Sequence, residues 1–150
     1  MAEHDYKKFP VLTNKQLEEF GFTSPHKQIT EDFEAHVVKV HDGDTITLRT
    51  TFRDFDFPLR LIDIDSPEMN AGGEIARDWL IEQIEGQDVQ IRIDRNSRVG
   101  KYGRLLGKVI SKGLDMGEAE IRLGYAVKFG SKLEYSPPPV DKIFRLNQWF

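Results

Sequence analysis

The chain of 150 residues contains no cysteine, and this absence excludes disulfide bonds and thiolate metal sites. It also lacks an apolar run long enough to span a membrane, and its charged first ten residues lack the apolar stretch of a secretory signal. These absences predict that the protein has no membrane partner. They fit a cytoplasmic location by default, or export or release by another route.

Nor does the chain have an excess of positive charge, since 21 Lys and Arg stand against 25 Asp and Glu for a formal net charge of −4. A protein that coats nucleic acid by charge alone is therefore disfavoured. An enzyme needs positive charge only where a phosphate binds, and a site that gathers carboxylates around a cation makes the balance more acidic. The length and the hydrophobic share of 39% suit one globular domain with a single core.

Residues 1–33 are predicted to form an N-terminal extension with a short helix. Thr13 and Gln16 have the spacing of a capping box, and Gly21 follows the predicted helix end. A segment that packs on the domain surface is favoured over an arm that binds a partner. Residues 34–150 are predicted to form the domain itself.

The predicted domain begins with β-strands and continues with helices and strands in turn. Asp42-Gly43 between two β-rich runs is a strong hairpin signal, and Val38 and Val40 alternate as one buried face of the first strand should. Five strands are predicted, at residues 36–41, 45–50, 55–64, about 89–93 and 105–110. Helices are predicted at residues 74–84, from Asp115 to just before Gly124, and at about 140–148. This order suits an α+β fold, a five-stranded OB-type β-barrel with about three helices.

Three short segments concentrate unusual polar residues at the predicted strand ends. The first is Asp42-Gly43-Asp44-Thr45, which alone indicates only a hairpin tip. The second runs from Arg60 to Glu68 and crowds three carboxylates together, which repel one another unless a cation lies among them. The third is Lys101-Tyr102-Gly103-Arg104, which alone is a tight turn with a basic rim.

Together the three segments predict a cation beside a phosphate. Asp44 and Asp65 offer the hard oxygen ligands that suit calcium or magnesium, while no histidine pair has the spacing of a zinc site. Arg60 and Arg104 offer forked donors that match the oxygens of a phosphate.

The chain resembles the staphylococcal nuclease family in segments that occur in the family's order, with the predicted helix at 74–84 between them. The resemblance covers roughly residues 35–150. The matching segments are residues 37–45, Arg60 through Glu68, Lys101-Tyr102-Gly103-Arg104, and Leu146-Asn147-Gln148-Trp149.

The resemblance implies a calcium-dependent nuclease. Such an enzyme hydrolyses phosphodiester bonds of DNA, RNA or both with little sequence specificity and leaves 3′-phosphate ends. One calcium ion would be held by Asp44, Asp65 and the backbone carbonyl of Ser66, with Asp42 just outside the ligands.

The resemblance also implies roles for the remaining polar residues. Glu68 would be the general base that activates water. Arg60 and Arg104 would bind the scissile phosphate and stabilise the transition state, and Lys101 and Tyr102 would contact the substrate. We expect the protein to be a monomer.

The alternative is a module of the same fold that binds nucleic acid or protein without catalysis. Such modules have lost ligand aspartates, the base or the arginines, whereas here the full set is present. An OB-type oligonucleotide binder unrelated to the family is disfavoured too, because it would interleave aromatic and basic residues on one face. In this chain Phe52, Phe55 and Phe57 cluster before the third predicted strand, where core packing is the simpler interpretation.

The chain departs from the family near the predicted site at Gly100, where relatives usually have aspartate, at Asp63 and after Gly124. Asp63 stands where relatives have an apolar residue or glycine, and a solvated side chain is favoured over one that adds negative field to the cation site. The tyrosine-rich segment that holds a base is missing after Gly124, and Phe129 and Tyr135 are the aromatic candidates to replace it.

Overall fold

The computed structural model describes residues 29–100 and 104–129. The five main strands are β1 (Phe33–Val40), β2 (Thr45–Arg49), β3 (Phe57–Leu61), β5 (Asp88–Arg92) and β6 (Leu105–Ser111). The other elements are β4 (Ile64–Asp65), the 3-10 helix η1 (Met69–Ala71), α2 (Gly73–Ile84), β7 (Leu114–Asp115), α3 (Met116–Leu123) and β8 (Val127–Lys128). The helices predicted in the extension and at residues 140–148 lie outside the described residues.

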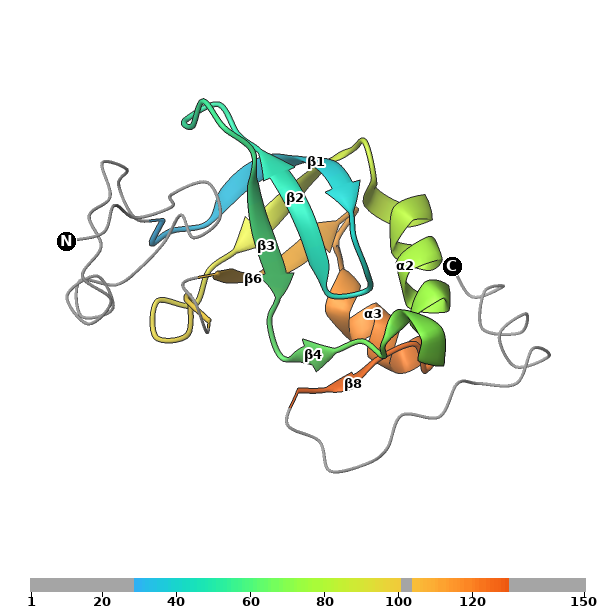
Figure 1. Ribbon diagram of the computed structural model, residues 1–150. Coiled ribbons are helices and arrows are strands. Elements are labelled where there is room, and N and C mark those ends of the chain that lie inside the picture. Colours follow the sequence, from blue (N-terminus) through green and yellow to red (C-terminus); the bar gives the residue numbers. More distant parts are fainter. Residues whose placement is uncertain (1–28, 101–103, 130–150) are drawn as a thin grey trace, which may run out of the picture.

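The five main strands close into a barrel. They lie in the order β3-β2-β1-β5-β6, and each pair of neighbours in that order is antiparallel. A parallel pairing of β3 with β6, in which Leu59 lies opposite Leu105, joins the two ends of the sheet. Figure 1 shows the barrel with α2 and α3 beside it and with β4 and β8 running next to each other. The predicted α+β fold with a five-stranded OB-type barrel is therefore confirmed.

The first strand does not alternate as the sequence predicted. Its pairing with β2 shifts between Val37 and Lys39, which is a β-bulge. One extra residue in a strand reverses the faces of the residues beyond it. Val37 and Val40 are therefore buried, while Val38, which we expected to share the face of Val40, is only half-buried.

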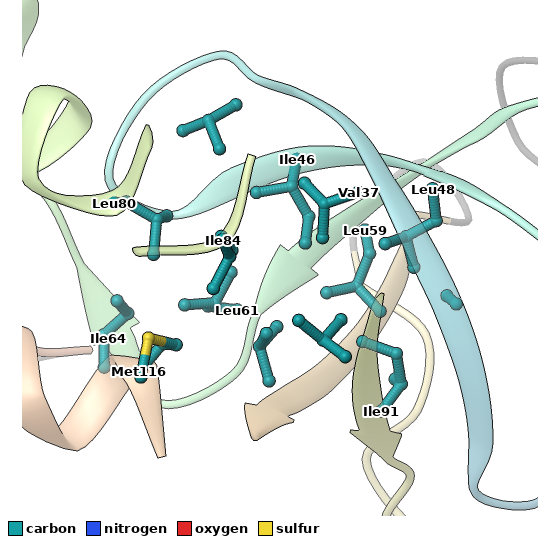
Figure 2. Close-up of a cluster of buried hydrophobic side chains, with 14 of the residues drawn as sticks. Val37, Ile46, Leu48, Leu59, Leu61, Ile64, Leu80, Ile84, Ile91 and Met116 are labelled. Atoms are coloured by element: carbon teal, nitrogen blue, oxygen red, sulfur yellow. The ribbon is translucent and has the colours of Figure 1, made fainter. Parts of the chain in front are cut away.

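The core fills the barrel and extends under both helices (Figure 2). In Figure 2, Leu80 and Ile84 of α2 lie near Leu61 of β3, and Met116 of α3 lies beside Ile64. Full burial of one such side chain stabilises the fold by roughly 1.5–3 kcal/mol. The labelled barrel side chains with at most 2% of their surface exposed are Val37, Ile46, Leu48, Leu59, Leu61, Ile64 and Ile91.

Both ends of α3 match the sequence prediction. The Oδ1 atom of Asp115 accepts a hydrogen bond of 3.2 Å from the backbone N–H of Glu118, so Asp115 caps the N-terminus. Gly124 adopts φ of +80° at the C-terminus, a conformation that favours glycine. These two caps therefore set the length of α3.

Residues just before β1 already contact the barrel. The side chain of Ile29 is buried in the core, and its carbonyl accepts a hydrogen bond of 3.3 Å from Arg98. The Oδ1 atom of Asp32 accepts one of 2.7 Å from the backbone N–H of Ile93. Within the described residues, no helix is long and apolar enough to cross a membrane.

Candidate active site

The loop between β1 and β2 is held by backbone hydrogen bonds at both of its ends. The N–H of His41 donates to the carbonyl of Thr45 at 3.0 Å, as expected for a hairpin. The N–H of Leu61 donates to the carbonyl of Asp44 at 2.7 Å, which fixes the loop against β3. The hairpin predicted from Asp42-Gly43 is thus confirmed, and its tip is anchored to a second strand.

Glycine is required in this loop for close packing rather than for an unusual φ. The φ of Gly43 is outside the left-handed region. A Cβ atom there would lie 2.6 Å from Cβ of Ala76, 2.6 Å from Oε1 of Glu120 and 2.9 Å from Cβ of Ser66. The loop between residues 42 and 44 therefore rests directly on α2, on α3 and on the turn after β4.

Asp44 lies at the inner end of the site, with 11% of its side chain exposed. Its Oδ2 atom accepts a hydrogen bond of 3.1 Å from the N–H of Ser66 and lies 3.5 Å from Nη2 of Arg60. Burial opposes its ionisation, but contacts with Asp42, the Ser66 N–H and Arg60 outweigh burial and lower its pKa. Asp44 is therefore an ionised carboxylate, held in place by its neighbours, whose oxygens could bind a cation.

Asp42 holds the backbone of Asp44 through a hydrogen bond. Its Oδ1 atom accepts a hydrogen bond of 3.0 Å from the backbone N–H of Asp44. Burial, a hydrogen bond with Asp44 and the negative charge of that neighbour raise the pKa of Asp42 to about 6. Asp42 thus keeps its proton to higher pH than Asp44 does, and the ionised member of the pair is the one that faces the arginine.

The segment that the sequence predicted as one strand, residues 55–64, is interrupted. The chain leaves β3 after Leu61, turns at Ile62 and Asp63, and resumes as β4 at Ile64. Asp63 adopts φ of +68°, and aspartate tolerates this left-handed region better than most residues do. Its exposed position at the turn agrees with a solvated side chain.

The turn brings the second carboxylate to Arg60. The Nη2 atom of Arg60 lies 3.6 Å from Oδ1 of Asp65, and the same nitrogen contacts Asp44. Both carboxylates therefore lie within ion-pair distance of the same nitrogen, although they come from different elements. Asp65 is the more open of the two, with 55% of its side chain exposed.

The turn after β4 carries the two remaining predicted residues of this segment. The N–H of Ser66 points at Asp44, so residue 66 lies beside the two carboxylates. Glu68 follows at the N-terminus of η1, and its carbonyl accepts hydrogen bonds of 2.9 Å from Ala71 and Gly73. These two bonds fix the backbone of Glu68 and leave its side chain exposed to solvent.

Arg104 enters the site from the start of β6. Its carbonyl accepts a hydrogen bond of 2.7 Å from the N–H of Gly100, which holds the loop that precedes it. Arg60 and Arg104 line one pocket of about 480 Å³ together with apolar side chains of Ile62 and Leu106. The structure therefore brings the two predicted arginines together. Lys101 and Tyr102 lie outside the described residues.

Phe129 forms another wall of this pocket. The centre of its ring lies 5.1 Å from the guanidinium carbon of Arg60, a distance typical of a cation–π contact. The ring is 65% exposed, and the backbone N–H of Phe129 donates to the carbonyl of Asp63 at 2.9 Å. Of the two aromatic candidates after Gly124, Phe129 is thus the one whose place at the site is described.

Glu120 is a site residue that the sequence analysis missed. It lies on the inner face of α3, has none of its surface exposed, and approaches the loop beneath Gly43. Neither of its carboxylate oxygens has a hydrogen-bond partner within the part of the chain that the structure describes. A signal was present, because Met116, Ala119, Glu120 and Leu123 have the spacing of one apolar helix face.

The donor set at Asp44 and Asp65 fits a hard divalent cation. Two carboxylates from different elements converge, and calcium prefers oxygen ligands. Among the described residues, no three His, Cys, Asp or Glu side chains gather closely enough to hold a metal by themselves. A cation here would need further ligands besides Asp44 and Asp65, such as a backbone oxygen and water, and the ligand role of the Ser66 carbonyl stays a prediction.

The sequence is similar to one protein family and to two known bacterial proteins. Residues 58–143, more than half of the chain, match the model of the staphylococcal nuclease homologue family. A protein of Shigella flexneri described as a micrococcal nuclease is 42% identical over 82 residues, which are 52% of this chain and 42% of that protein. An uncharacterised protein of Bacillus anthracis is 28% identical over 104 residues, which are 65% of this chain and 48% of that protein. The chain spans less than half the length of these curated relatives.

Proposed function

Because the chain belongs to the staphylococcal nuclease homologue family, we propose that it is a calcium-dependent nuclease that hydrolyses phosphodiester bonds of DNA, RNA or both. The relative described as a micrococcal nuclease supports this proposal, since its similarity includes half of this chain. The observation that carries the proposal is the position of Arg60, which contacts both candidate cation ligands and lines a pocket with Arg104.

One calcium ion would be held by Asp44, Asp65 and the backbone carbonyl of Ser66, with water completing its coordination. When bound, the ion would supply a positive charge that polarises a phosphoryl oxygen. Asp44 suits this role because it is ionised and fixed by Ser66 and Arg60. Asp42 would hold the backbone of Asp44 in place through its hydrogen bond.

Glu68 would act as the general base. Water is a poor nucleophile near neutral pH, so a carboxylate must remove its proton as the oxygen attacks phosphorus. The exposed side chain of Glu68 follows directly after the turn that carries Asp65 and Ser66. We expect its carboxylate to act on a water molecule at the open side of the Asp44–Asp65 pair.

Arg60 and Arg104 would bind the scissile phosphate and stabilise the transition state. Negative charge increases on the phosphoryl oxygens during attack, so forked donors bind the transition state more tightly than the ground state. Removal of one such donor typically costs about 3–4 kcal/mol of transition-state stabilisation. Departure of the 5′-oxygen would leave a 3′-phosphate on one product.

The substrate would be recognised mainly through its phosphates. Contacts to phosphate carry no base information, so we expect little sequence specificity. Lys101 and Tyr102 are proposed to contact the substrate as well. The ring of Phe129, beside Arg60 and largely exposed, offers a surface on which a base can stack.

A module of this fold that binds nucleic acid or protein without catalysis is the alternative. It requires none of the carboxylates to converge, whereas here Asp44 and Asp65 meet at Arg60. This convergence favours the catalytic interpretation.

A digestion assay tests the proposal. The purified protein is incubated with single-stranded DNA, duplex DNA and RNA, in calcium chloride and in a chelator. We expect cleavage in calcium, loss of cleavage in the chelator, and 3′-phosphate ends that block extension by a polymerase until a phosphatase removes them. Intact DNA and RNA at high protein concentration in calcium would support the binding module instead.

A further inference from the structure

The position of Glu120 conflicts with the ordinary demands of a protein core. It belongs to the face of α3 that also buries Met116, Ala119 and Leu123, where an apolar side chain would stabilise the fold. Burial of a carboxyl group that makes no hydrogen bond destabilises the folded protein. A buried carboxyl group is stabilised by a positive charge or by a hydrogen-bond donor close to it.

No basic side chain offsets this carboxyl within the described residues. Burial is the main reason why the pKa of Glu120 is raised, and the negative charges of Asp44 and Asp42 raise this pKa further. Arg60 lies close enough for an ion pair with Asp44 and Asp65 instead. The acidic groups around the loop between residues 42 and 44 therefore outnumber the one arginine that pairs with them.

The geometry directs Glu120 at the candidate cation site. Its Oε1 atom lies 2.6 Å from the point where a Cβ of Gly43 would be, so it touches the backbone between Asp42 and Asp44. It is not placed to act as a third side-chain ligand, because no three acidic or histidine side chains of the described residues gather closely enough for that. Because its carboxyl is fully buried, Glu120 can act on a cation only from beneath the loop that carries Asp44.

We propose that Glu120 is a positioning residue for the cation site, whose buried carboxyl group strengthens calcium binding by Asp44 and Asp65 from beneath the loop at Gly43. This inference rests on the proposed function, because it takes calcium to be the cation. Groups that support metal ligands without touching the metal commonly change metal affinity by about 10- to 100-fold. The unpaired carboxyl of Glu120 lowers the stability of the cation-free protein, and binding of the ion offsets this loss of stability.

The test compares Glu120→Gln and Glu120→Leu with the wild-type full chain. Calcium affinity is measured by titration calorimetry with calcium chloride, and melting temperature is measured in chelator and in calcium. We expect both variants to bind calcium at least about tenfold more weakly. In chelator both should melt at or above the wild-type temperature, because the unpaired carboxyl group has been removed, and calcium should raise their melting temperature less.

Glu118→Gln is the matched control, since Glu118 lies on the same helix with an exposed side chain. It should bind calcium as the wild type does. Calcium affinity of Glu120→Gln and Glu120→Leu within twofold of the wild type would overturn the inference, as would unfolding of both variants in chelator. A wild-type protein that cuts DNA in calcium while these variants bind calcium normally contradicts this inference alone. A wild-type protein that neither binds calcium nor cuts contradicts the proposed function as well.

Discussion

Arg60 contacts acidic groups on one side and an aromatic ring on the other. Its Nη2 atom is 3.5 Å from Asp44 and 3.6 Å from Asp65, and its guanidinium carbon is 5.1 Å from the centre of the Phe129 ring. A planar guanidinium can pair at its edge and stack on its face at the same time, which lysine cannot do. Arg60 therefore contacts both carboxylates and also lines the pocket that contains Arg104.

At the same scale, Phe129→Ala should weaken substrate binding more than it slows the chemical step. Base stacking on an aromatic ring contributes roughly 1–3 kcal/mol per base, so we expect KM for single-stranded DNA to rise about tenfold with kcat within twofold. Steady-state kinetics on a short oligonucleotide measure both constants. Phe52→Ala is the control, because Phe52 is similarly exposed but contacts Phe33 at a centroid distance of 5.5 Å. Equal KM values for the two variants would remove Phe129 from the substrate surface.

The sequence identified most residues of the site because their type was unusual for their place. An arginine in an apolar strand and aspartates at strand ends stand out, and the structure brings Asp44, Asp65 and Arg60 together. Glu120 did not stand out in the same way, since glutamate is common in helices. Its meaning depends on which face of α3 is buried and on contact with Gly43, which is 77 positions away in the sequence.

The elements place the site through a few local features of the chain. The turn at Ile62 and Asp63 divides the predicted third strand and redirects β4 towards the hairpin loop. The bulge in β1 moves Val40 to the core, next to the start of that loop. Sequence alternation predicts neither feature, because it assumes a constant period of two along each strand. The helix boundaries were easier to predict, since caps depend on single residues.

At the scale of one element, Asp115→Ala should destabilise the protein without weakening the cation site. The change removes the hydrogen bond from Asp115 to the Glu118 N–H at the start of α3, and loss of an N-cap costs about 1 kcal/mol. Urea unfolding measures this loss, and Asp115→Asn should keep most of the stability because asparagine also caps helices. An equal loss in both variants would contradict the capping role, and a large fall in calcium affinity would contradict the separation of cap and site.

At the scale of the whole molecule, the candidate site lies at one end of the closed barrel. The hairpin loop between β1 and β2, the β3–β4 turn and the start of α2 meet there (Figure 1). A Cβ atom at Gly43 would lie 2.6 Å from Cβ of Ala76 in α2. Strand content and order sufficed to predict the barrel. The parallel pairing of β3 with β6 depends on two segments more than 40 residues apart, and local sequence patterns carry no information on such pairing. The same closure sets Arg60 opposite Leu106, close to Arg104.

With a formal net charge of −4, the chain as a whole has no positive charge that would attract nucleic acid. Turnover would therefore depend on a few positioned groups and not on a general attraction for nucleic acid. Among these groups, Glu68 is the one whose removal should stop chemistry while leaving the carboxylate pair, the arginines and the fold intact.

The most direct measurement is single-turnover cleavage of a DNA oligonucleotide in calcium by the wild type and by Glu68→Gln, with DNA binding and melting temperature recorded on the same samples. General-base catalysis contributes about 10²–10⁴-fold. The account predicts that Glu68→Gln cuts at least about a hundredfold more slowly, while its DNA affinity and melting temperature match those of the wild type. Cleavage by Glu68→Gln at the wild-type rate, or the absence of cleavage by the wild type despite DNA binding, would contradict it.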